Sequence, residues 1–182
     1  MWRTAAAAAH TAEIEAYSSR QPHLPLEPDC GQAYIDEEGR LTIHSKSIGI
    51  HLHAAMVAPG IGVEMDKIRL VQNPAGGTFG YKFSPTMEAL VGVACLACDG
   101  RPVSLVYDMF QNITYTGKRS PVFMNLRVGA DEQGKLVALE GRNILDHGPY
   151  SEFGDLLTLR LAQYHLAGYD VPNIRTDHYT VC

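Results

Sequence analysis

This sequence lacks three features that would each assign it to a distinct class of protein. Its 182 residues contain no apolar run near the roughly 20 residues that cross a bilayer, so we expect no membrane-spanning segment. Basic residues number 15 against 20 acidic ones, and the net charge of −5 gives no basic face for nucleic acid. The four cysteines are too few and too scattered for a disulfide scaffold, which favours a reduced, cytoplasmic setting.

The remaining composition is that of an ordinary globular protein. Hydrophobic residues make up 46% and charged residues 19%, enough apolar material for a core. The early alanine run in MWRTAAAAAH is interrupted by His10 and has no leucine-rich continuation. We therefore expect an ordinary helix or an irregular start here rather than a signal peptide, and the alanine content of residues 5–16 favours the helix.

The order of local patterns predicts an α+β fold with mixed sheets, β-hairpins and packed helices. Two strand pairs turn at DEEG and DEQG, where glycine supplies a positive φ. A helix over IGIHLHAAMVAPGIG is expected to end at Pro59 and Gly60, and another is expected to begin at Ser84. The stretch PVSLVYDMF reads as a strand, residues 151–166 as a last helix and the tail as a strand. No low-complexity linker divides the chain, so one mixed unit is expected.

A glycine-rich turn over residues 72–83, QNPAGGTFGYKF, lies between an expected strand and an expected helix. Such a junction exposes backbone N–H groups and the positive end of a helix dipole, an arrangement that binds anions. Gly76 and Gly77 would let a ligand approach the backbone, and Lys82 could add a positive charge. The turn matches neither the Walker loop nor the three-glycine dinucleotide fingerprint. An ordinary turn without a ligand is the alternative.

Other chemically capable residues form weaker patterns. The histidines show no metal-ligand spacing. Cys95 and Cys98 form a CxxC inside an apolar helix and are better explained as core residues. Glu27 and Asp29 stand in a proline-rich loop, where acids usually form a solvated or hydrogen-bonded turn. Phe153 and Leu156 share a helical face that could line a pocket or pack an ordinary core.

Five stretches occur in the order in which the xanthine oxidase family carries them in its large molybdenum-binding region. They are QPHLPLEPD, IHSKSIGIHLH, GGTFGYKFSPTMEAL, YTGKRSP and DHGPYSEFGDLLTLR. From about residue 12 to residue 182 the chain resembles this family, and above all its bacterial aldehyde oxidoreductases that carry molybdopterin cytosine dinucleotide. The resemblance implies that residues 1–29 end a substrate-channel domain with its connecting segment. Residues 30–182 would then form the truncated N-terminal portion of the first molybdopterin-binding domain.

The resemblance also implies a chemistry and a site. Members of the family hydroxylate a substrate carbon with oxygen from water at a molybdenum centre, and electrons leave through iron–sulfur clusters. In the family the glycine loop lies against the molybdenum side of the pterin. By that match the cofactor-binding residues of this chain are expected to be Gly76, Gly77, Thr78, Phe79 and Gly80. Phe79 would pack beside the metal, although no residue of this chain is expected to ligate it.

Residues of a substrate channel follow from the same resemblance. Purine-oxidising members carry a glutamate at the position of Phe83, and a phenylalanine would leave the polar groups of a purine unpaired. Phe153 and Leu156 match positions that line an apolar channel in aldehyde-oxidising relatives. Ile48 stands where many members place a glutamine. We therefore expect an aldehyde rather than a purine as the substrate.

Several parts of the family's machinery have no counterpart in this sequence. The glycine-rich motif that carries the catalytic glutamate is absent, and so are the cysteine-rich iron–sulfur domains. The resemblance thus implies a piece of a larger molybdenum hydroxylase, inactive alone, whose partners are the remaining domains or subunits. It also implies a homodimer of the whole enzyme. A stand-alone pterin- or nucleotide-binding module and a non-functional truncated product are the alternatives.

Overall fold

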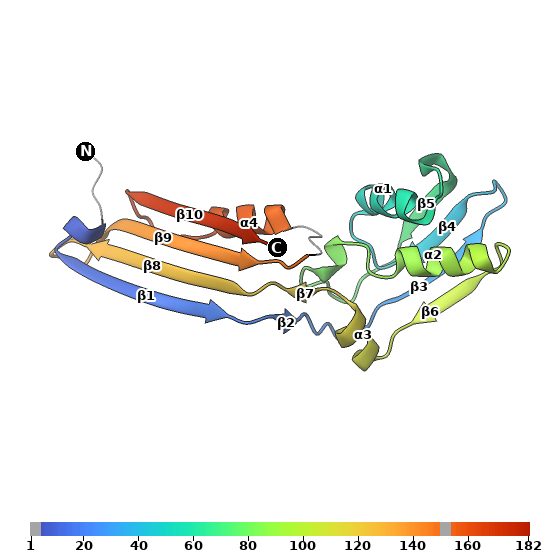
Figure 1. Cartoon of the computed structure of the whole chain (residues 1–182), viewed down its shortest axis with the longest axis horizontal. Helices are drawn as coiled ribbons and strands as arrows, with labels where there is room; N and C mark the ends of the chain where they lie inside the picture. The colour runs from blue at the N-terminus through green and yellow to red at the C-terminus, as the bar shows by residue number, and fades with distance from the viewer. Residues whose placement is uncertain (1–4, 150–153) are drawn as a thin grey trace. The chain divides into compact units, whose positions relative to one another are not determined.

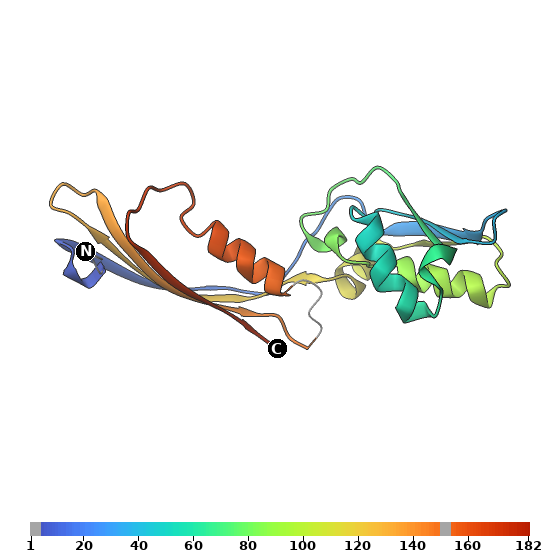
Figure 2. The ribbon, with the colours of Figure 1, turned by 90° about the horizontal axis from the view of Figure 1, so that it is seen from above.

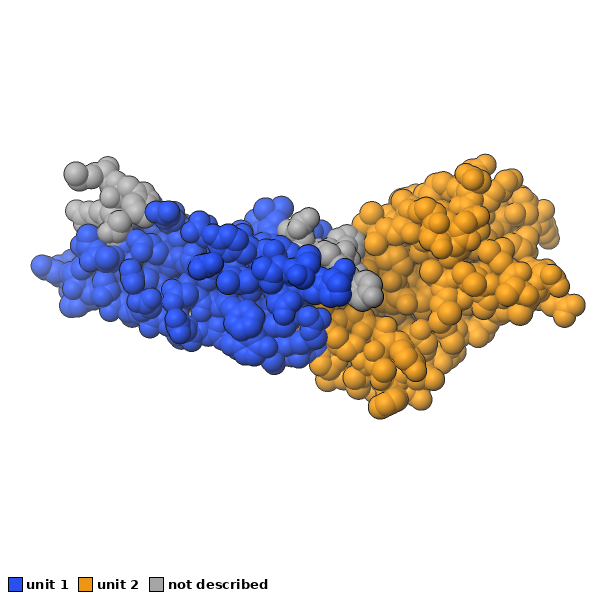
Figure 3. All heavy atoms as spheres, in the orientation of Figure 1, with its two compact units in different colours: residues 1–21, 120–182 blue, residues 22–119 orange. Residues whose placement is uncertain are grey.

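The computed structural model describes residues 5–149 and 154–182. The chain forms two compact units, coloured separately in Figure 3. Unit 1 comprises Met1–Gln21 and Ser120–Cys182, and unit 2 comprises Pro22–Arg119. The expectation of one mixed unit was therefore wrong, because each half builds its own sheet and needs no linker of biased composition. The family-domain boundary at residue 29 stays a prediction.

Unit 1 is built on a four-stranded sheet in the order β1-β8-β9-β10. Strands β1, β8 and β9 are antiparallel, and β10 runs parallel to β9. Helix α4 lies along one face of this sheet (Figure 2). The bounds are η1 Ala5–Ala7, β1 His10–Ser18, β8 Val122–Ala130, β9 Leu136–Asp146, α4 Gly154–Gln163 and β10 Ile174–Val181.

Unit 2 contains a second four-stranded sheet in the order β5-β4-β3-β6, with helices α1 and α2 packed together on it (Figure 1). A short pair of strands, β2 and β7, joins the segments where the chain passes between the units. The bounds are β2 Gln21–Pro22, β3 Cys30–Ile35, β4 Leu41–Ser45, α1 Ile50–Ile61, η2 Met65–Lys67, β5 Ile68–Gln72, η3 Tyr81–Phe83, α2 Glu88–Ala97, β6 Val103–Val106, α3 Met109–Tyr115 and β7 Lys118–Arg119.

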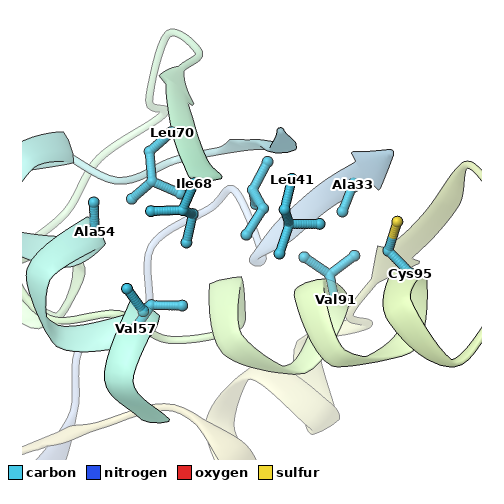
Figure 4. Close-up of a cluster of buried hydrophobic side chains, with 10 residues drawn as sticks. Ala33, Leu41, Ala54, Val57, Ile68, Leu70, Val91 and Cys95 are labelled. Atoms are coloured by element: carbon cyan, nitrogen blue, oxygen red, sulfur yellow. The ribbon is translucent and has the colours of Figure 1, made fainter. Parts of the chain in front are cut away.

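The core of unit 2 lies between its sheet and the two helices. Figure 4 shows Leu41 and Ile68 from the sheet facing Val57 from α1 and Val91 from α2. All four side chains are buried, which removes them from water at a gain of about 1.5–3 kcal/mol each. This packed core therefore supports the end of β4 and the loops that follow it.

The α+β class and both hairpins were predicted correctly. Gly39 and Gly134 have φ values of 74° and 82°, as their turns require. In the second turn the Asp131 carboxylate accepts the N–H groups of Gln133 and Lys135, which closes the loop between β8 and β9.

Several element predictions were wrong. Residues 5–16 form a short 3-10 turn and strand β1, because pairing along all of β8 overrides the helical propensity of alanine. Helix α1 continues through Pro59 and ends at Ile61, and Gly62 after it has a φ of 71° and forms a left-handed cap. Ser84 is not the N-cap of α2, since α2 begins at Glu88 and its N-cap is Met87. The strand expected over PVSLVYDMF stops at Val106, and α3 starts after it.

The last helix was predicted with the right type but with longer bounds than α4 has, and its expected start at Ser151 lies outside the described residues. The tail strand is confirmed as β10. In the part of the chain that the structure describes, no helix has the length and apolar character needed to span a membrane.

Candidate functional site

The glycine loop over residues 72–83 leaves β5 and ends in the 3-10 turn Tyr81–Phe83. Gly77 and Gly80 have φ values of 105° and 108°, in the region that favours glycine. Phe79 between them has a φ of 47°, which is uncommon for a residue with a bulky side chain. Strained backbone of this kind persists where surrounding structure holds it and is frequent at ligand sites.

The loop presents unpaired donors on an exposed surface. The backbone N–H groups of Gly77, Thr78 and Phe79 have no hydrogen-bond partner among the described residues. Successive free N–H groups in a turn form a concavity that binds oxygen atoms or anions. Phe79 is 58% exposed and Phe83 is 55% exposed. The loop therefore offers polar donors and two apolar surfaces to a ligand.

One carboxylate lies beneath this loop. Glu27 Oε2 accepts the Gly76 N–H at 2.6 Å and the Lys82 ammonium at 3.0 Å. Its other oxygen pairs with Lys46 at 2.8 Å, and Lys46 also donates to the Pro74 carbonyl at 2.9 Å. Desolvation raises the pKa of Glu27, but the hydrogen bonds from Lys46, Gly76 and Lys82 outweigh it and lower the pKa to about 2. Glu27 is therefore ionised at neutral pH.

Lys82 is a buried cation. Its side chain is only 1% exposed, and Glu27 supplies the opposite charge. A buried ammonium without such a partner would be strongly unfavourable. The expectation that Lys82 could offer its charge to a ligand therefore does not fit the structure, because the buried ammonium is already paired with Glu27.

A buried histidine holds the other side of the turn. His53 Nε2 lies 2.6 Å from the Phe83 carbonyl, and its Nδ1 lies 2.6 Å from the Ser47 hydroxyl. A carbonyl only accepts, so Nε2 carries the proton and donates it; in the neutral ring Nδ1 then accepts from Ser47. Glu88, also buried, approaches Nδ1 to 4.0 Å. Helix α1 thereby fixes the backbone at Phe83.

A second acid is buried near the start of α2. Asp29 is 1% exposed, its carboxylate accepts a hydrogen bond from the Thr86 hydroxyl, and its backbone N–H donates to Asn112 Oδ1 at 2.9 Å. Burial raises the pKa of Asp29, and the hydrogen bond from Thr86 acts in the opposite direction. The expected hydrogen-bonded turn is correct, but Asp29 is not solvated. No local pattern in HLPLEPD signals this burial, since Leu24 and Leu26 beside the acids are exposed.

The remaining candidates divide between the units. Leu156 is on helix α4 of unit 1 and is 44% exposed, whereas the glycine loop and Phe83 belong to unit 2. Phe153 lies outside the described residues. Cys95 is buried as expected, but Cys98 is exposed and does not pack in the core. Within residues 5–149 and 154–182, no three histidine, cysteine or acidic side chains cluster as a metal site.

Comparison with known proteins places this geometry in context. Residues 2–182 match the molybdopterin cofactor-binding domain family. The chain is 59% identical over 165 residues to the aldehyde oxidoreductase of Megalodesulfovibrio gigas, covering 91% of this chain and 18% of that protein. It is 30% identical to the nicotinate dehydrogenase large molybdopterin subunit of Eubacterium barkeri, covering 90% of this chain and 38% of that subunit.

The structural comparison agrees with the sequence comparison. A solved aldehyde oxidoreductase from Desulfovibrio gigas is 57% identical and aligns with a TM-score of 0.88, covering 97% of this chain and 19% of that chain. The chain thus spans about a fifth of the length of the two aldehyde oxidoreductases that it matches.

Proposed function

Because the chain belongs to the molybdopterin cofactor-binding domain family, we propose that its glycine loop forms one wall of the cofactor site in an aldehyde oxidoreductase. The whole enzyme would convert aldehydes to carboxylic acids with water as the oxygen source. The observation that carries the assignment is the set of free N–H groups at Gly77, Thr78 and Phe79 on an exposed loop.

The residues present fit such a group. Molybdopterin and the oxygen ligands of its metal are rich in hydrogen-bond acceptors, and the loop supplies donors without competing side chains at Gly77 and Gly80. A Cβ at Gly77 would stand 3.0 Å from the Phe79 ring, so the glycine also leaves room for that ring. When bound, the cofactor would supply the redox chemistry. The loop would bind and orient it, and Phe79 would exclude water beside it.

The substrate class follows from the second exposed ring. Phe83 offers an apolar surface without a donor or acceptor, and His53 holds its backbone in place. A purine pressed against it would leave polar groups unpaired at a cost of about 1–3 kcal/mol each. Leu156 and Phe153 are proposed as further substrate-channel residues of the whole enzyme. We therefore propose an aldehyde as the substrate.

The proposal extends to the rest of the enzyme. The cofactor would be the cytosine dinucleotide form, and iron–sulfur clusters in other domains or subunits would accept the electrons. The family domains would divide near residue 29, and the whole enzyme would form a homodimer in the cytoplasm. The four free thiols agree with a reducing compartment.

A chimera tests the proposal directly. At 59% identity, this chain can replace the matching segment of the Megalodesulfovibrio gigas aldehyde oxidoreductase. We expect about one molybdenum per chimera and faster turnover of benzaldehyde than of xanthine. A folded chimera that lacks molybdenum would overturn the cofactor assignment, and faster xanthine turnover would overturn the substrate assignment.

Two variants at one position sharpen the substrate test. Phe83→Glu should lower kcat/KM for benzaldehyde by about tenfold or more, because a charged carboxylate replaces an apolar wall. The matched control, Phe83→Leu, keeps the wall apolar and should stay within about threefold of the parent chimera. Equal effects of both variants would mean that Phe83 acts through shape alone.

The isolated chain addresses the alternative of a stand-alone module. Since one wall cannot enclose the cofactor, we expect the purified chain to hold no stoichiometric molybdenum and to oxidise no aldehyde. Elemental analysis showing about one molybdenum per chain would favour the stand-alone module.

A further inference from the structure

We propose that Glu27 is a positioning residue that fastens both ends of the glycine loop and so sets the direction of its free N–H groups. The inference rests on the proposed function for the role of those N–H groups. The fastening itself rests on contacts within unit 2 alone.

A single oxygen atom carries the fastening. Glu27 Oε2 accepts from the Gly76 N–H, where the loop begins to turn, and from the Lys82 ammonium, where it ends. The donors are 49 and 55 residues away from Glu27 in sequence. Between the two fastened points lie the unpaired N–H groups and Phe79. Their orientation therefore depends on one carboxylate that touches none of them.

The geometry also assigns Gly76 a role of its own. A Cβ added there would stand 2.8 Å from Glu27 Cβ, a distance that real Cβ atoms do not tolerate. Gly76 thus lacks a side chain so that the carboxylate can reach its N–H group. The ligand-facing part of the loop would then begin at Gly77.

The charges around Glu27 strengthen its hold on the loop. Lys82 is buried and its ammonium requires an anion, so the side chain cannot leave Glu27 without leaving a buried charge unpaired. Its backbone immediately precedes Phe83, so the same ion pair places the proposed substrate-facing ring. The second oxygen of Glu27 is held by Lys46, which limits rotation of the carboxylate. The other acids in this region, Asp29 and Glu88, are engaged by Thr86 and by backbone N–H groups at the start of α2.

The test uses the whole chain and needs no cofactor. In Glu27→Gln, hydrogen exchange of the hydrogen-bonded loop amides at Gly76, Tyr81 and Phe83 should accelerate about tenfold or more, because the charge-assisted contacts of Glu27 at both ends are lost. The Gly76 amide proton should also lose the downfield chemical shift expected of a 2.6 Å hydrogen bond to a carboxylate. The matched control is Glu37→Gln, an exposed acid in the first hairpin, which should change neither measurement.

A second variant keeps the test decisive if Glu27→Gln unfolds unit 2. Gly76→Ala retains every charge but pushes a methyl group against Glu27, and it should loosen the same residues. Exchange in β4 reports whether the core stays folded. Unchanged loop exchange in both variants, with the core intact, would overturn the proposal.

The chimera separates this inference from the proposed function. In Glu27→Gln, benzaldehyde kcat should fall by about tenfold at an unchanged molybdenum content, since the loop would be present but misdirected. If the parent chimera binds no molybdenum while the loop still loosens, the proposed function fails and the fastening stands. If the chimera is loaded and active but the variant matches it in exchange and in kcat, the fastening fails alone.

Discussion

Replacing His53 with phenylalanine should lower the free energy of unfolding of unit 2 by about 2–4 kcal/mol. The ring volume is nearly kept, so the change removes hydrogen bonds rather than packing. Ser47 is fully buried and would lose the nitrogen that accepts its hydroxyl, at a cost of about 1–3 kcal/mol. The Phe83 carbonyl is partly buried and would lose its donor for about 1 kcal/mol more.

Amide hydrogen exchange in β4 measures this change within unit 2, without assuming that both units unfold together. Two residues earlier in α1, His51 is exposed and its side chain has no hydrogen bond or ion pair among the described residues. His51→Phe is therefore the matched control and should alter stability by less than about 0.5 kcal/mol. A loss below about 0.5 kcal/mol for His53→Phe would refute the reasoning, because the two short hydrogen bonds would then contribute nothing net.

Three further outcomes follow from burial and charge. Gly92→Ala should lower the free energy of unfolding by about 1–2 kcal/mol, because the new Cβ would crowd core side chains at 3.2–3.4 Å. In Gly60→Ala the Cβ meets nothing within 4 Å, so this variant should gain about 0.5–1 kcal/mol of stability, and thermal denaturation compares the two. Iodoacetamide should modify exposed Cys98 rapidly and Cys95 only on unfolding, since burial raises the pKa of the Cys95 thiol, and equal rates by mass spectrometry would contradict this. The pKa of Glu27 falls from 4.5 to about 2 on folding, so its ionised form stabilises the fold by about 1–2 kcal/mol after solvent screening. This contribution is complete above pH 4.5 and is lost as the pH falls toward 2. Urea titrations should therefore show Glu27→Gln and the parent chain converging in acid.

Local patterns were readable from the sequence because their causes are local. The hairpin turns need a glycine at positive φ and an acid that accepts nearby N–H groups, and both conditions lie within a few residues. The glycine loop was recognisable for the same reason, since its conformation depends on the positive φ values of Gly77 and Gly80.

The support beneath the loop could not be read in the same way. No pattern along the chain pairs Glu27 with Lys82, because only the folded sheet and helices bring them together. The first strand was misread as a helix because its partner, β8, lies far along the sequence and alanine content alone favours a helix. Tertiary pairing decided both cases.

The discontinuity of unit 1 has a consequence for synthesis on the ribosome. Glu13 and Arg127, neighbours across β1 and β8, are 114 residues apart in the chain, so the first strand emerges long before its partner exists. Unit 2 is continuous and can complete its own sheet in the interval. Until β8 is made, β1 lacks the strand that pairs with it among the described residues, and it carries an exposed isoleucine and tyrosine, the kind of segment that chaperones shield from aggregation.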